Sequence, residues 1–201
     1  MTHIGHSEKV FIMKRLLLIL ILTFSLQSLT KANDIGDFEI EGISVGDSLL
    51  DYFSKDQINQ DKYFLFDNKK WGTFLDISPS YENYEALQFF FDNKDSKYEI
   101  HRIDGIIGYA NNIDACNEKK DSIVNQITSL LTNIKKRDKN EKHNLDKSGK
   151  SFVFQTIFDF PNGSSFAIEC YDWEGELEKE YMDKLVVAIS SKEIIDFINN
   201  E

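Results

Sequence analysis

The sequence is poor in proline, cysteine and histidine, and these scarcities limit the chemistry that we expect. Proline occurs twice, cysteine twice and histidine four times in 201 residues. Only His101 and His143 lie beyond residue 32, and no clustered His, Cys or carboxylate spacing typical of a zinc site accompanies them. Phosphate-binding glycine loops, nucleophile-elbow motifs and calcium-loop motifs are missing as well. We therefore expect no metal, no cofactor and no locally encoded catalytic residue; a Ser–His–Asp triad assembled only by folding stays open.

Long apolar runs are also scarce. The longest, Leu16–Leu26, is short of the roughly 20 residues that a membrane-spanning helix needs. It follows the basic pair Lys14-Arg15 and precedes a polar stretch ending at Ala32, which is the layout of a secretory signal peptide. We predict that residues 1–32 are a signal peptide, with residues 1–12 a mis-assigned start, and that residues 33–201 form a single domain. The expected location is periplasmic or secreted, without a stable membrane anchor; an uncleaved anchor is the alternative.

Basic residues are fewer than acidic ones, 23 against 34. Residues 1–32 contain four basic residues and the single acidic Glu8, so their removal changes the net charge from −11 to −14. Such a surface repels phosphate backbones, and we expect no nucleic-acid partner. Two charged segments stand out, the basic connection Lys135–Lys150 and the acidic loop Asp172–Asp183. Either could dock a partner of opposite sign, and the acidic loop could hold a cation weakly; solvated loops are the plain alternative.

Apolar spacing predicts an α+β domain, an antiparallel sheet with helices packed on one face. A short helix is expected after a capping box at Ser44, with a second turn to about Gln60. The one long helix should run from Asp114 to about Asn133. The other expected elements are strands at 62–67, 71–77, 85–92, 98–109, 151–160, 164–173 and 184–190, and a closing helix at 191–199. Two tandem halves, each a helix followed by a strand meander, are suggested by this order. Gly105 and Gly108 suggest a bulge in their strand.

The hairpin Ser151–Trp173 allows a specific prediction of register. Pro161-Asn162-Gly163 is typical of a three-residue loop in which glycine takes the positive-φ position. Phe158 should then face Phe166, and the five phenylalanines of the hairpin fall on one face with Ile168 and Cys170. A slip of one residue would invert these faces, so this register is strongly preferred.

The two cysteines, Cys116 and Cys170, both follow the predicted signal peptide. In an oxidising compartment a disulfide is the expected outcome, with a reactive thiol as the alternative. Cys116 lies on the apolar stripe of the long helix, in its first turn, and Cys170 on the apolar face of the hairpin. If the helix packs on that face, the two sulfurs can meet.

The opposite face of the hairpin carries our predicted partner-binding residues, Ile157, Glu169, Tyr171 and Trp173. An ordinary solvated face would be mostly Lys, Glu, Thr and Ser. Aromatic side chains beside a few charges are instead typical of interaction surfaces. The hypothesis is that this face is exposed and contacts a protein or peptide. The alternative is that the acidic loop or the closing helix covers it as a second core.

Three segments, DFEIEGISVGDSLLDYFS, DKSGKS and ECYDW, resemble a group of small exported bacterial proteins of unassigned function. The resemblance implies a secreted domain and carries no activity. The element order alone is similar to the β-lactamase-inhibitor-like fold and to the outer-membrane assembly lipoprotein BamE, although the lipidated cysteine of that lipoprotein is missing here. Fold does not settle function. We expect a non-catalytic binding or adaptor domain; the alternatives are a structural envelope protein acting as an oligomer and, third, a hydrolase.

Overall fold

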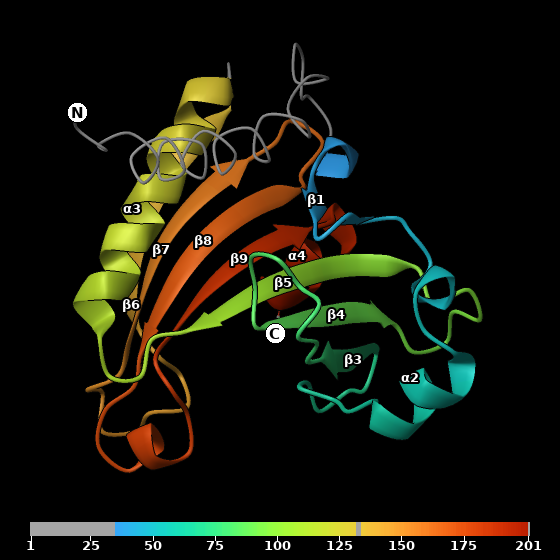
Figure 1. The fold of residues 1–201 in the computed structure, drawn as a ribbon, viewed down its shortest axis with the longest axis horizontal. Helices are drawn as coiled ribbons and strands as arrows, with labels where there is room; N and C mark the ends of the chain where they lie inside the picture. Colours follow the sequence, from blue (N-terminus) through green and yellow to red (C-terminus); the bar gives the residue numbers. More distant parts are fainter. Residues whose placement is uncertain (1–34, 132–133, 201) are drawn as a thin grey trace, which may run out of the picture. The chain divides into compact units, whose positions relative to one another are not determined.

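The computed structural model describes residues 35–131 and 134–200 (Figure 1). The predicted signal peptide and its mis-assigned start lie outside the described residues. Asn33–Glu201 group together as one compact unit. Among the described helices, none is long and apolar enough to cross a membrane.

One sheet of seven antiparallel strands organises this unit, in the order β3-β4-β5-β9-β8-β7-β6 (Figure 1). The α+β class and the antiparallel sheet are therefore confirmed. Two three-stranded meanders, β3-β4-β5 and β6-β7-β8, are joined through β9 at the centre. The strands are β3 (Trp71–Asp76), β4 (Ala86–Asp92), β5 (Ile100–Gly108), β6 (Lys135–Lys142), β7 (Phe152–Asp159), β8 (Ser165–Asp172) and β9 (Lys184–Ser190).

The first face of the sheet carries the main core and the long helix α3 (Ile113–Leu130), which lies along the β7–β8 side (Figure 1). Asn112, and not Asp114, caps the helix, because its side chain accepts a hydrogen bond from the Ala115 N–H. The segment before β3 supplies the remaining cover of this face. It contains the 3-10 helices η2 (Ile35–Asp37) and η3 (Leu49–Asp51), the two-stranded sheet β1 (Glu39–Ile40) and β2 (Ile43–Ser44), and helix α2 (Lys55–Asp61).

The predicted disulfide between Cys116 and Cys170 is confirmed. The two Cα atoms are 6.0 Å apart, and both residues are fully buried. The bond joins the first turn of α3 to β8, the strand on which the helix packs. Val124 is the other buried residue of α3, and the partly buried Ile123 and Ile127 pack against the core beside it.

The predicted hairpin register is confirmed as well. Phe158 pairs with Phe166, and the Phe160 N–H donates to the Ser164 carbonyl at 3.0 Å. Gly163 has φ +88°, the left-handed region that glycine enters without strain. Turn chemistry and the two-residue period of a strand were sufficient to fix this part of the fold.

The short helix α4 (Lys192–Ile198) packs on the second face of the sheet, which differs from our expectation that all helices share one face. Its Ile194 joins Trp71 and Phe90 in a separate cluster, with Phe66 and Phe197 at the edge. Phe90 follows Phe89 of the main core, and neighbouring strand residues point to opposite faces. The second face is thus covered at the β3–β4 end.

Three local predictions are wrong. Ser44 does not cap a helix, because Gly46 at φ +98° turns the chain out of helical geometry and Ser48 caps the short helix η3. The second turn, by contrast, forms as predicted: it is α2, with Ser54 as its N-cap. Of the strand expected at 62–67, only a single bridge between Tyr63 and Thr73 forms. The basic connection expected at Lys135–Lys150 begins with the eight-residue edge strand β6, whose side chains point to solvent on both faces and show no apolar alternation.

Gly105 is required for packing, not for a bulge. The register shifts between Phe90 and Phe91, which pair with Arg102 and Ile100, so the extra residue of this strand pair is His101 of β5 and lies away from Gly105. A Cβ atom at Gly105 would lie 2.5 Å from the Tyr84 ring, so the glycine makes room for that aromatic side chain.

Candidate functional site

The structure places the four predicted partner-binding residues on one face but exposes them much less than the hypothesis requires. Ile157, Glu169 and Trp173 are buried, and Tyr171 is half-buried. Ile157 belongs to a small second core with Ala167, Val186 and Ala188. The prediction that this part of the sheet face is exposed is therefore wrong for three of the four residues.

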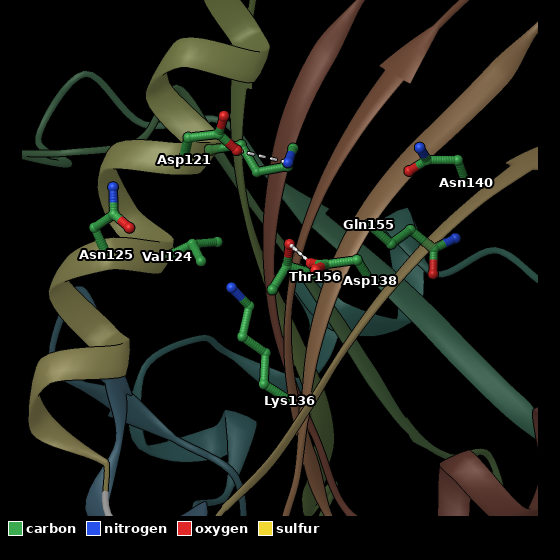
Figure 2. A pocket seen from close by; sticks show the side chains of 9 residues that line it. Asp121, Val124, Asn125, Lys136, Asp138, Asn140, Gln155 and Thr156 are labelled. Carbon is green, nitrogen blue, oxygen red and sulfur yellow. Dashed lines mark hydrogen bonds and ion pairs between the residues drawn. The ribbon is translucent and has the colours of Figure 1, made fainter.

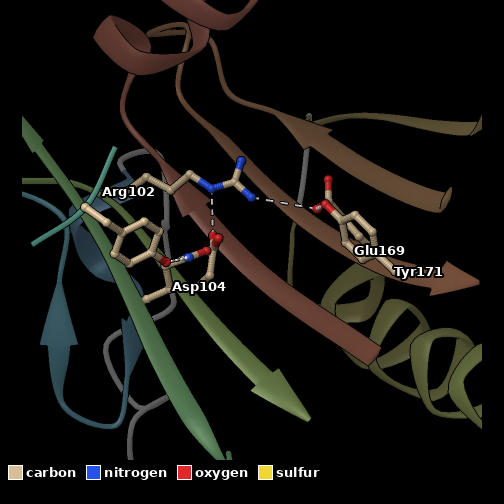
Figure 3. Close-up of polar contacts among 6 residues, drawn as sticks. Arg102, Asp104, Glu169 and Tyr171 are labelled. Atoms are coloured by element: carbon tan, nitrogen blue, oxygen red, sulfur yellow. Dashed lines mark hydrogen bonds and ion pairs between the residues drawn. The ribbon is translucent and has the colours of Figure 1, made fainter. Parts of the chain in front are cut away.

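Glu169 belongs to a buried charge network that spans three strands of the second face (Figure 3). Arg102 Nε donates to Asp104 Oδ1 at 2.7 Å, and Arg102 Nη2 lies 3.7 Å from Glu169 Oε2. Arg102 lies on β5 and Glu169 on β8, so the guanidinium reaches across β9. Ala188 of β9, which pairs with Asp104, has a side chain short enough to leave room for that crossing.

Burial dominates the electrostatics of this network. It raises the pKa of Glu169, with a smaller contribution from Asp104, while the Arg102 charge opposes the rise. The pKa of Asp104 is also raised by burial and held back by Arg102. Removing the guanidinium would leave two carboxyl groups buried without their cation, so Arg102 is the member on which the network depends.

Tyr171 and Lys184 extend the network toward the N-terminal end of β9, which begins at Lys184. The Tyr171 hydroxyl donates to Glu169 Oε2 at 3.0 Å, and Lys184 Nζ lies 5.2 Å from the centre of the Tyr171 ring. Burial lowers the pKa of Lys184, and the charges of Asp104 and Glu169 oppose that shift. The Lys184 ammonium group therefore interacts with the Tyr171 ring and with the charges of Asp104 and Glu169.

Trp173 is covered by the acidic loop, which was the alternative to an exposed face. Its ring stacks on Tyr181 with centroids 4.7 Å apart, and the His143 ring lies 4.3 Å away on a third segment. The backbone N–H of Trp173 donates to Asp183 Oδ1 at 2.9 Å, so the main chain is tied to the loop as well as the stacked ring. The indole is thus part of the structure that holds the loop on the sheet.

Beside this stack, the same loop and the second face enclose a groove of about 330 Å³, which we call the apolar groove. Its floor is the paired row Ala86 and Ile106 with the neighbouring pair Gly108 and Lys184. Its lining comprises Ile77, Glu85, Ala86, Ile106, Gly108, Glu180, Tyr181, Met182 and Lys184. The groove is an open hollow of the second face that is bounded by the acidic loop.

The walls of the apolar groove carry large side chains that are unusually exposed. Ile77 is 74% exposed, Met182 49% and Tyr181 39%. The Met182 side chain packs directly on the backbone of Gly108. A Cβ atom at this position would lie only 2.3 Å from the Met182 Cε atom. Gly108 therefore admits the methionine side chain, and Glu85 closes this corner by accepting the Gly108 N–H at 3.0 Å. Contiguous exposed apolar side chains of this size mark surfaces that contact something else.

The rim of the apolar groove is acidic. Glu85 and Glu180 line it, and the loop that forms its wall also carries Glu174, Glu176 and Glu178 against the single cation Lys179, which pairs with Glu176 at 2.8 Å. Apolar walls inside a negative rim can hold an aliphatic side chain whose neighbours are positively charged.

A second hollow, of about 390 Å³, lies between α3 and β6 and is polar (Figure 2). Lys136, Asp138 and Asn140 of β6 face it, and Asp138 accepts a hydrogen bond from the Thr156 hydroxyl at 2.6 Å. On the helix side, Lys120 pairs with Asp121 at 2.9 Å. We call this hollow the polar groove.

Sequence reasoning missed Ile77, Tyr181, Met182 and the role of Gly108. The available signal was the pair Tyr181-Met182, two large apolar residues inside an acidic loop. Within the part of the chain that is described, no group of three or more His, Cys, Asp or Glu side chains is arranged to hold a metal ion.

No protein-family model, curated protein or solved structure matches this chain. The resemblance to small exported bacterial proteins and to the BamE fold therefore stays a prediction.

Proposed function

We propose that this protein is an exported, non-catalytic binding domain that holds a segment of a partner protein in the apolar groove. The segment that fits presents an aliphatic side chain flanked by lysine or arginine. The observation that carries the proposal is the exposed set Ile77, Tyr181 and Met182 inside an acidic rim. This assignment keeps the binding function expected from the sequence and moves its site to the open end of the same sheet face.

The apolar half of the proposal rests on area and shape. A groove of about 330 Å³ is too small for a folded domain and large enough for one or two side chains of a peptide. Hot spots of interfaces are side chains that fill such pockets and exclude water. Tyr181 is braced from behind by its stacking on Trp173, which gives the groove one rigid wall.

The charge half of the proposal rests on the balance around the groove. Its only lining cation, Lys184, is engaged with the Tyr171 ring and the buried carboxyl groups. The rim carboxylates Glu85 and Glu180 therefore dominate the field outside. In a protein with a net charge of −11, such a rim speeds the approach of a basic segment and repels an acidic one.

Export is supported by coarser observations. A disulfide-bonded pair, in a chain whose described helices include none able to cross a membrane, is compatible with an exported protein. Mass spectrometry of the protein recovered outside the cytoplasm should show a new N-terminus near Asn33. Recovery of a chain that still carries residues 14–30 would contradict cleavage.

A defined peptide tests the groove. The probe is a fluorescent Lys-Leu-Lys-Leu-Lys peptide, compared with Lys-Ser-Lys-Ser-Lys and Glu-Leu-Glu-Leu-Glu by anisotropy. Met182→Asp and Ile77→Asp should each weaken binding of the leucine-lysine peptide at least tenfold. Leu65→Asp, at a residue 55% exposed outside the groove lining, is the matched control and should change it less than twofold.

The design separates apolar contact from charge attraction. Each variant adds one negative charge, so a purely electrostatic interaction with the basic peptide would become stronger in all three. Weaker binding in the groove variants alone supports the proposal. Equal binding of the serine peptide, or unchanged binding by Met182→Asp and Ile77→Asp, overturns it. A hydrolase would instead shorten the peptide, which chromatography of the same samples reveals.

A further inference from the structure

The two edge strands of the sheet differ in whether their outer side is paired. At β3, the outer edge is bridged by Tyr63, whose N–H and carbonyl both bond Thr73 at 2.9 Å. At β6, no strand in the described ranges pairs with the outer edge, which is eight residues long. An open edge of this length presents a row of backbone donors and acceptors to any extended chain that can approach it.

The side chains of β6 decide which chain can approach. Five are basic and two are acidic, in a protein whose overall charge is −11. Arg137 pairs with Asp159 at 2.8 Å and Lys139 with Glu141 at 2.6 Å, so both acidic partners nearby are already engaged. Three other lysines of the strand, Lys135, Lys136 and Lys142, have no ion pair within the described ranges.

The polar groove adds space beside this edge. Lys136 and Asn140 point toward α3, where an apolar strand would have packed against the helix (Figure 2). The helix side contributes Asp121 and Asn125, and the buried Val124 and Thr156 form the floor. Side chains of a strand added to β6 would therefore meet polar groups and water on this face, not the core.

We propose that β6 is a docking edge for an extended acidic segment of a partner protein, which adds to the sheet as an eighth strand. Backbone pairing would supply affinity, and the three unpaired lysines would select carboxylates. This surface is separate from the apolar groove and has the opposite charge preference, so it does not depend on the function proposed above.

A second copy of this chain is the less favourable occupant. Each β6 strand carries five basic and two acidic side chains, so two copies repel overall; in an antiparallel pairing centred between Asp138 and Lys139, Lys135 would lie opposite Lys142 at both ends, although Lys136 opposite Glu141 and Asp138 opposite Lys139 would attract. Like charges placed directly opposite destabilise a strand pair, and lysine on an edge is a common guard against self-association. An acidic strand would face five basic side chains and only two like charges, Asp138 and Glu141.

The test uses an eight-residue peptide that alternates Glu and Thr, because threonine favours strands and glutamate supplies the charge. Binding to the full chain is followed by NMR of backbone amides and by anisotropy of a labelled peptide. The expected result is saturable binding with the largest amide shifts in β6, and a marked loss of affinity on adding salt. A Lys-Thr peptide should not bind.

Two perturbations separate strand addition from simple charge attraction. Lys135→Glu/Lys136→Glu should weaken binding at least tenfold, whereas the matched double variant Lys94→Glu/Lys97→Glu, in the turn before β5, should change it less than threefold. A Glu-Thr peptide methylated on alternate backbone nitrogens, on the set that would donate to β6, should also lose at least tenfold. Both double variants replace exposed side chains, and equal melting temperatures verify their folding.

Three results would overturn the proposal. The first is a methylated peptide that binds as tightly as the parent whichever alternate set of backbone nitrogens is methylated, which would mean charge attraction without strand pairing. The second is an equal loss of affinity in the two double variants, which would mean a general field effect. The third is a dimer in sedimentation that the Lys135→Glu/Lys136→Glu variant dissociates, which would assign the edge to a second copy.

Discussion

Removal of the Cys116–Cys170 disulfide should destabilise the protein by several kcal/mol. The bond spans 54 positions of sequence, and closing a loop of that length restricts the unfolded chain by about 4 kcal/mol in the chain-entropy model. Both residues are fully buried in the core, so alanine is the substitution that introduces no unpaired polar group. We therefore expect Cys116→Ala/Cys170→Ala to lose about 4 kcal/mol of unfolding free energy.

The loss should be largest where α3 meets the sheet. Without the bond, Val124 is the one remaining buried residue of the helix, supported by the partly buried Ile123 and Ile127. Hydrogen exchange of the helix amides should then speed up more than exchange in β5 or β9. For a domain of this size, a loss of 4 kcal/mol corresponds to a fall of roughly 8–16 °C in melting temperature.

Urea unfolding monitored by circular dichroism measures the effect, and the chemically reduced wild-type protein supplies an internal control. The reduced protein and the double alanine variant should unfold at nearly the same urea concentration. A loss below about 1 kcal/mol, with helix exchange unchanged, would refute the reasoning, because it would mean that packing alone holds α3 in place.

Three further predictions follow from the second face. Arg102→Met should cost about 3–5 kcal/mol in urea unfolding, because it leaves Asp104 and Glu169 buried without their cation; a cost below 1 kcal/mol would show that the network is solvated. Burial and then the Lys184 charge lower the pKa of His143 from 6.5, so its contribution to stability is complete above pH 6.5 and is lost as the pH falls toward the folded-state pKa. The unfolding free energy of wild type should accordingly fall more steeply below pH 6.5 than that of His143→Gln. Parallel curves would show that His143 does not contribute to the pH dependence of stability. Gly108→Ala should displace the flexible end of Met182 and weaken binding of the leucine-lysine peptide, with less than about 1 kcal/mol of change in stability by thermal melting.

The hairpin and the disulfide could be predicted because their determinants are local and periodic. Pro161-Asn162-Gly163 specifies the turn, the turn fixes the register, and the register places Cys170 on the face that the helix stripe must cover. The edge strand β6 could not be found in this way. It buries neither face, so its sequence lacks the apolar alternation by which strands are recognised.

The candidate site was only partly accessible from the sequence. The composition of Glu169, Tyr171 and Trp173 indicated an unusual face, and the charges and rings prove to be mostly buried there. Their burial depends on non-local contacts, such as Arg102 reaching across β9 and Tyr181 returning to stack on Trp173. No spacing rule within one strand encodes either contact. The sequence therefore predicted an exposed surface around Trp173, which is in fact buried.

The most direct test of the binding function is the methyl signal of Met182. Methionine occurs three times, and the other two are Met1 and Met13, so a chain cleaved after residue 32 and labelled with 13C-methyl methionine carries its single reporter in the apolar groove. Titration with Lys-Leu-Lys-Leu-Lys should shift this signal to saturation, and Lys-Ser-Lys-Ser-Lys should leave it in place. A Met182 signal that does not move while the leucine peptide binds, or a peptide that does not bind at millimolar concentration, would contradict the account.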